Sequence, residues 1–180
     1  MSNIAFTEYH LSDKKENLQL LESILCDGIE MSEILEHFGI DTNDLTLCGE
    51  LADCYQIDDE NLMLQFHTTW DWQEDFYQQL RKHFPTMEVS FSCIEEGGKL
   101  FVTNNFGVFP HRYFLDSNFG VSEYYTSFED VKNRLKSDTM LRDVAKTLGD
   151  VNSEQELATA LAEWNKTNHK QVHLYLFEEV

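Results

Sequence analysis

The chain has 180 residues, of which 42% are hydrophobic and 13% aromatic, with only two prolines, so it is a globular protein long enough to bury a core. Its formal net charge of −20 argues against direct binding of nucleic acid, because such binding needs cations that displace the counterions of the phosphate backbone. The sequence has no apolar run of about 18 residues and begins without the basic and apolar regions of a signal peptide. We therefore expect a cytoplasmic protein that does not enter membranes.

The acidic residues are unevenly distributed along the chain. Residues 16–80 contain 16 acidic residues and no lysine or arginine, whereas residues 101–180 contain 12 acidic and eight basic residues. One very acidic half is therefore joined to a nearly balanced half. The acidic half is interpreted either as a solubilising surface or as a face for a cationic partner.

The most regular part of the sequence is residues 61–106. Apolar residues alternate with a period of two where strands are expected, and are spaced by four where a helix is expected. The expected elements are a strand over 62–69, a helix over 73–84, a strand over 87–94 and a return strand over 99–103. Asp71 is the expected N-cap of the helix, and Pro85 ends it. Gly97-Gly98 predicts a tight turn before the return strand.

Three pieces of this part resemble a known family. Residues 64–70, a helix that closes on Phe84-Pro85, and residues 91–98 are similar to the ferredoxin-like domain of YubB-like proteins, which are typically encoded on plasmids and genomic islands. The resemblance covers about a quarter of the chain, and the chain departs from the family pattern at Thr69, where alanine is usual. It implies a ferredoxin-like fold and brings no established activity.

The flanking regions predict further elements from the same patterns. These are a strand or ordered arm over 6–11, helices over 14–26 and 30–38, a strand over 50–57, an aromatic loop within 104–120, helices over 127–135, 139–148 and 153–165, and a terminal strand over 172–177. We expect a single α+β domain over residues 1–180, with an acidic helical part (1–46), a sheet core (47–106), and a part with the aromatic loop, helices and terminal strand (107–180). The expected fold is a ferredoxin-like antiparallel sheet of about four or five strands, with helices on one face and helical additions at both ends.

Catalytic motifs are absent from the sequence. No nucleophile elbow or phosphate-binding loop is present, and no two histidines have the H-x-H spacing of a metal site. The four cysteines are expected to be small buried side chains rather than metal ligands, and no cofactor or metal is expected. They are Cys26, Cys48, Cys54 and Cys93.

The leading hypothesis is a non-enzymatic interaction protein that binds, and inhibits or sequesters, a basic protein. That partner could be a nucleic-acid-binding or host-defence protein, which a DNA mimic would block. Acidic residues around an aromatic anchor suit such an interface. The candidate partner-binding residues are Glu30, Glu33, Glu36, Asp41, Asp44, Asp58, Asp59, Glu60, Trp70 and Trp72.

Two alternatives remain open at this point. The first is a small enzyme with a site formed by His67, Glu95 and Glu96. The second is a structural or immunity-type partner protein that uses the aromatic loop over residues 106–119. The sequence leaves the oligomeric state open.

Overall fold

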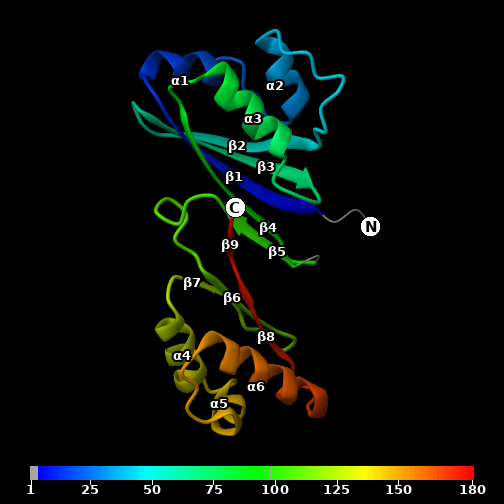
Figure 1. Cartoon of the computed structure of the whole chain (residues 1–180), viewed down its shortest axis with the longest axis vertical. Helices are drawn as coiled ribbons and strands as arrows, with labels where there is room; N and C mark the ends of the chain where they lie inside the picture. The colour runs from blue at the N-terminus through cyan, green and yellow to red at the C-terminus, as the bar shows by residue number, and fades with distance from the viewer. Residues whose placement is uncertain (1–3, 98) are drawn as a thin grey trace. The chain divides into compact units, whose positions relative to one another are not determined.

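A computed structural model of the chain describes residues 4–97 and 99–180 (Figure 1). The protein is α+β, and the chain packs as two compact units. Unit 1 comprises the chain up to Phe109 together with Glu179–Val180, and unit 2 comprises Pro110–Glu178. The division lies close to the expected boundary after residue 106, and the single domain over residues 1–180 stays a prediction.

Unit 1 is built on a six-stranded sheet, which has more strands than the four or five expected. Its strands are β1 (Ile4–Ser12), β2 (Gly49–Asp58), β3 (Asn61–Thr69), β4 (Glu88–Glu95), β5 (Leu100–Thr103) and β9 (Glu178–Glu179), in the order β2-β3-β1-β4-β5-β9. The pairs from β2 to β5 are antiparallel. The sequence does not predict β9, because two adjacent glutamates carry no strand pattern.

Three helices of unit 1 cover one face of the β1–β2–β3 part of the sheet (Figure 1). They are α1 (Lys15–Glu22) and α2 (Met31–His37), between β1 and β2, and α3 (Glu74–His83), between β3 and β4. On the covered face, the Tyr9 ring packs edge-on against Phe66 and Phe76, and all three side chains are fully buried. β2 and β3 form an antiparallel hairpin, and β1 lies between β3 and β4 and is antiparallel to both.

The prediction that Asp71 caps the helix in residues 73–84 is wrong. α3 begins at Glu74 after Gln73, which has φ of 60°, and no side chain caps it. The Asp71 carboxylate instead accepts a hydrogen bond from the Gln73 backbone N–H at 2.8 Å, which closes a turn before the helix. The helix ends before Pro85, as expected.

Unit 2 has a sheet and a core of its own. Its strands are β6 (Tyr113–Ser117), β7 (Ser122–Tyr125) and β8 (Val172–Leu176), in the order β7-β6-β8, and its helices are α4 (Phe128–Ser137), α5 (Arg142–Leu148) and α6 (Glu154–Thr167). Ser127 and Ser153 cap α4 and α6 through their hydroxyl groups, as the sequence predicts. The expected terminal strand corresponds to β8, which pairs with β6.

Candidate functional site

The predicted partner-binding carboxylates all lie in unit 1 and fall into two groups. The first group, on α2 and the loop after it, is Glu30, Glu33, Glu36, Asp41 and Asp44; the second, in the β2–β3 turn, is Asp58, Asp59 and Glu60. A bridge between Glu30 and Glu50 places the first group near the Thr69 end of β3, since Glu50 lies opposite His67. β3 spans nine residues, about 27 Å from end to end, and the groups lie towards opposite ends of it, so they do not form one cluster.

These carboxylates are exposed, and their hydrogen-bond donors are mostly neutral. Glu36 accepts from the Thr42 hydroxyl at 2.7 Å, and Asp58 accepts from the Asn61 side-chain amide at 2.7 Å. The hydrogen bonds to Asp58, led by that of Asn61, lower the pKa of its carboxyl group. Of the eight carboxylates, only Asp59 has a lysine or arginine partner in the described part of the chain, namely Lys15 at 2.9 Å. The other seven keep their charge uncompensated.

The two predicted tryptophans have different environments. Trp72 is half-buried and stacks on Phe91, with ring centroids 4.2 Å apart and planes 6° apart, so it is part of the core. Trp70 is 63% exposed and has a φ of 75°, a conformation that a bulky side chain rarely adopts. Trp70 is therefore the aromatic side chain that this segment presents to solvent.

A hydrogen-bonded turn holds Trp70 in this strained conformation. Gln73 is buried, and its side-chain amide donates to the Thr69 carbonyl at 3.1 Å and to Asp71 at 2.9 Å. The Gln73 side-chain oxygen accepts from the Cys48 backbone N–H at 2.6 Å. Gln73 has no sequence signal for this role except its position directly after Trp70-Asp71-Trp72. Strain of this kind persists where the surroundings over-determine the backbone, and it is more frequent at functional sites.

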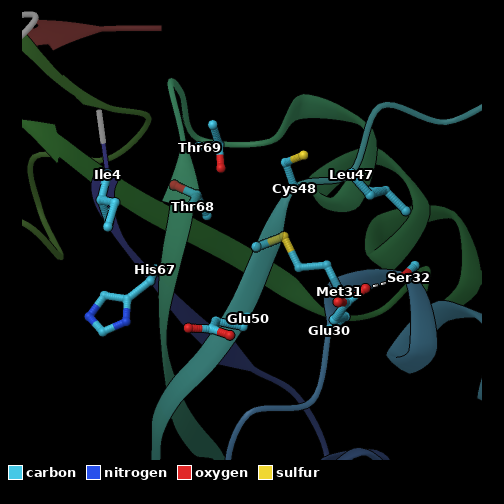
Figure 2. Close-up of a pocket in the computed structure, with 11 residues that line it drawn as sticks. Ile4, Glu30, Met31, Ser32, Leu47, Cys48, Glu50, His67, Thr68 and Thr69 are labelled. Carbon is cyan, nitrogen blue, oxygen red and sulfur yellow. Dashed lines mark hydrogen bonds between the residues drawn. The ribbon is translucent and has the colours of Figure 1, made fainter. Parts of the chain in front are cut away.

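A shallow pocket of about 330 Å³ lies at the same end of the β2–β3 hairpin (Figure 2). Glu30 lines it from the start of α2, and Glu50 and His67 line it from the sheet. Gly49 forms part of the wall, and a side chain there would collide with the Met31 sulfur, which would be 2.9 Å from a Cβ atom. Two carboxylates beside apolar walls suit a cationic side chain better than an anion.

Of the residues named for the alternative enzyme site, the strand register separates His67 from Glu95. His67 lies opposite Phe6 on the face that the helices leave uncovered, and its side chain is exposed. Glu95 is buried and lies on the other face, since it is two residues after Cys93, the partner of buried Thr7. Among the described residues, no group of three or more histidine, cysteine, aspartate and glutamate side chains is arranged to hold a metal ion.

Two other sequence predictions need correction. The aromatic loop over residues 106–119 contains the strand β6, and Phe109, Tyr113 and Phe114 are buried rather than presented to a partner. β6 lacks the alternation of a half-exposed strand because its first three residues are all buried, so sequence patterns did not reveal it.

The cysteines were expected to be buried. Cys93 is buried, whereas Cys26 and Cys48 are exposed and Cys54 is partly exposed. Burial, followed by the charges of Glu22 and Asp53, raises the pKa of the Cys54 thiol to about 11, which makes it a poor nucleophile near neutral pH.

No helix in the described part of the chain combines the length and the apolar character that crossing a bilayer requires. Comparison of the sequence with models of protein families and with curated proteins, and of the structure with solved structures, finds no match.

Proposed function

We propose that this chain is a non-enzymatic interaction protein that binds a basic protein through the acidic surface of unit 1, and that it inhibits or sequesters that partner. The observation that carries the proposal is the uncompensated charge of this surface. Unit 1 has 22 acidic residues against five basic ones, whereas unit 2 has 11 against eight. Exposed carboxylates without cationic neighbours repel one another, and a cationic partner relieves that repulsion.

Such a surface attracts its partner over a longer range than direct contacts reach. Association between a strongly acidic and a basic surface is accelerated at low salt and slows as ions screen the charges. Trp70 supplies an exposed aromatic anchor directly after Thr69, which lines the same pocket as Glu30, and aromatic anchors contribute much of the affinity of many protein interfaces.

The sharpest form of the proposal is a DNA mimic, whose target is a nucleic-acid-binding or host-defence protein. The resemblance to YubB-like proteins of plasmids and genomic islands favours such a target. The order of the elements in unit 1 supports the ferredoxin-like fold which that resemblance implies. The chain runs through β1, α1 with α2, β2, β3, α3 and β4, which is a βαββαβ arrangement, and the sheet order is β2-β3-β1-β4. A mimic binds where DNA binds, so added DNA duplex should release the partner.

Affinity capture from a bacterial lysate at low and high salt tests the proposal. We compare the native chain with three triple variants of equal charge change: Glu30, Glu33 and Glu36 to Gln; Asp58→Asn, Asp59→Asn and Glu60→Gln; and, as the control in unit 2, Asp116, Asp143 and Asp150 to Asn. We expect a basic protein that the native chain and the control retain at low salt, that high salt releases, and that at least one unit 1 variant loses. Equal capture by all four proteins would contradict the proposal.

A further inference from the structure

One face of the sheet in unit 1 has side chains of mixed character that the helices leave uncovered. Along β1, Tyr9 and Leu11 are fully buried on the helix side, whereas the intervening Glu8 and His10 are only half-buried. The same alternation runs along β3. We call the helix-free side of β1, β3 and β2 the open face.

Carboxylates lie at the centre of the open face. Asp53 of β2 lies opposite Gln65 of β3, which lies opposite Glu8 of β1, so the three form one row across the strands. The Gln65 side-chain amide donates a hydrogen bond to the Glu8 carboxylate at 2.7 Å, and not to Asp53. None of the three strands contains a lysine or an arginine.

Apolar and aromatic side chains flank this central row. Phe6 lies on one side of the row, and Tyr55 and Met63 form a cross-strand pair on the other. Tyr55 is 43% exposed, and partial burial, followed by the charges of Glu8 and Asp53, raises the pKa of its hydroxyl group. Its ring therefore lies within the field of both carboxylates. The face combines an apolar surface with a negative centre.

We propose that the open face is the docking surface of unit 1, and that it binds a segment of a basic protein whose arginine or lysine side chains reach Glu8 and Asp53 while its apolar side chains cover Phe6, Met63 and Tyr55. This proposal rests on the function proposed above and names the surface that performs it. Charge complementarity determines the occupant: a second copy would bring the same carboxylates face to face, whereas a basic segment neutralises them.

The first group of acidic residues then acts differently from the open face. Glu33 and Asp44 lie on α2 and the loop after it, and they contribute to the overall field that attracts the partner. Glu8 and Asp53 would make direct contacts that are desolvated on binding. Removing a direct contact raises the dissociation rate, whereas removing a distant charge mainly lowers the association rate and the salt dependence.

A defined peptide tests this difference. The probe is a fluorescein-labelled peptide of alternating arginine and leucine, and a peptide of alternating glutamine and leucine is its control; fluorescence anisotropy at low salt measures Kd for the full chain. The double variant Glu8→Gln/Asp53→Asn is compared with Glu33→Gln/Asp44→Asn, which removes the same charge. We expect the open-face variant to weaken binding at least about tenfold and the control variant less than about threefold.

Circular dichroism checks whether the double variant Glu8→Gln/Asp53→Asn is folded. If it is poorly folded, a second variant still tests the proposal. Tyr55→Lys adds a cation beside Glu8 and Asp53 on an exposed edge strand, and we expect it to weaken binding about tenfold or more as well. Equal losses in the open-face and control variants would overturn the open face as the docking surface and leave the proposed function standing. No binding of the arginine peptide, or equal binding of the glutamine peptide, would overturn both. Self-association of the native chain that excludes the peptide would assign the face to a second copy, and would likewise overturn the proposal.

Discussion

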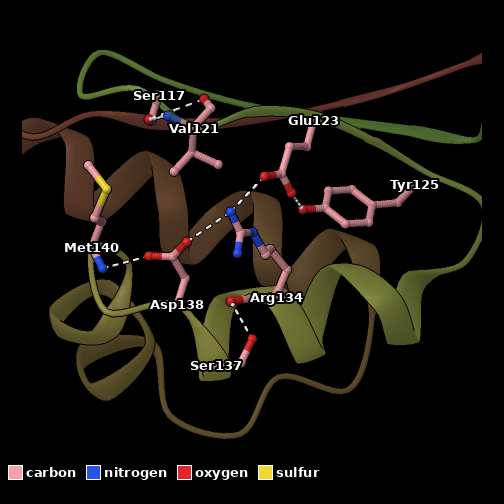
Figure 3. Close-up of polar contacts among 8 residues, drawn as sticks. All are labelled: Ser117, Val121, Glu123, Tyr125, Arg134, Ser137, Asp138 and Met140. Carbon is pink, nitrogen blue, oxygen red and sulfur yellow. Dashed lines mark hydrogen bonds and ion pairs between the residues drawn. The ribbon is translucent and has the colours of Figure 1, made fainter.

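The two units use their acidic residues in different ways. In unit 2, Arg134 of α4 binds Glu123 of β7 at 2.6 Å and Asp138 at 2.9 Å, and the Tyr125 hydroxyl donates to Glu123 (Figure 3). In unit 1, by contrast, Asp58 is held by an amide and a backbone N–H. Carboxylates that neutralise a cation of their own chain contribute to folding, whereas uncompensated ones remain available to another molecule. The candidate binding unit is therefore distinguished by exposed carboxylates that have no cation of their own chain beside them.

Replacing Arg134, which pairs with two carboxylates of unit 2, should have the largest effect on stability. Arg134→Met leaves Glu123 and Asp138 without their shared partner, and Asp138 is only 10% exposed. Because the Arg134 side chain is itself 32% exposed, we expect a loss of about 2 kcal/mol in the free energy of unfolding of unit 2, less than for a fully buried pair. Amide hydrogen exchange measured on peptides from each unit checks this value. Reduced protection in both units alike would show that their stabilities are not separate.

High pH should destabilise unit 2 through its buried tyrosine, Tyr113. Burial, followed by its hydrogen bond to the Glu154 carboxylate, raises the pKa of Tyr113 to about 12. The unfolded chain loses this proton from about pH 10, so the stability that Tyr113 contributes is present below pH 10 and falls as the pH rises towards 12.

We expect unit 2 to lose about 1.4 kcal/mol through Tyr113 at pH 11. Tyr113→Phe should remove this contribution, and Glu154→Gln should reduce it by removing the nearby charge. The pH dependence of hydrogen exchange in peptides of α6 and β6 measures it. An unchanged profile in both variants would mean that other tyrosines dominate the loss.

The fold of unit 1 was predictable to the extent that one face of each strand is buried. The alternation in residues 50–69 predicts the strands β2 and β3, and the spacing of four predicts α3. β4 is buried on both faces, yet its apolar residues from Met87 to Cys93 alternate, and this alternation already places Glu95 on the helix side, away from His67. Pairings between distant segments, such as β9 in the sheet of unit 1, leave no local pattern.

The candidate site was predictable by residue type but not by arrangement. The acidic residues of α2 and of the β2–β3 turn were identified, yet only the strand register shows that they lie at opposite ends of the hairpin. Which indole of Trp70 and Trp72 is exposed depends on a positive φ that the Gln73 hydrogen bonds maintain. Glu8 was overlooked, although a charged residue between Thr7 and Tyr9 in a strand indicates an uncovered face.

Salt should stabilise unit 1 more than unit 2. With 22 acidic residues against five basic ones, unit 1 is destabilised by repulsion among its own carboxylates, and ions at about 0.5 M screen this repulsion within a few ångströms. We expect unit 1 to gain about 1 kcal/mol between low salt and 0.5 M NaCl, while unit 2 changes little because screening also weakens its ion pairs. Hydrogen exchange at the two salt concentrations separates the units, with sucrose as the control for non-ionic stabilisation. A larger gain in unit 2 would contradict the conclusion that repulsion among its own carboxylates destabilises unit 1.

The smallest effect is expected at the one ion pair among the predicted partner-binding residues. Lys15 contacts Asp59 at 2.9 Å, and both side chains are well exposed, so water and salt screen the pair. We expect Lys15→Met to shift the unfolding temperature by less than about 2 °C. The same variant leaves Asp59 without its lysine partner, and should therefore raise the affinity of unit 1 for the arginine peptide slightly at low salt and not at high salt. A marked loss of stability would show that this pair, like those of unit 2, contributes to folding rather than to binding.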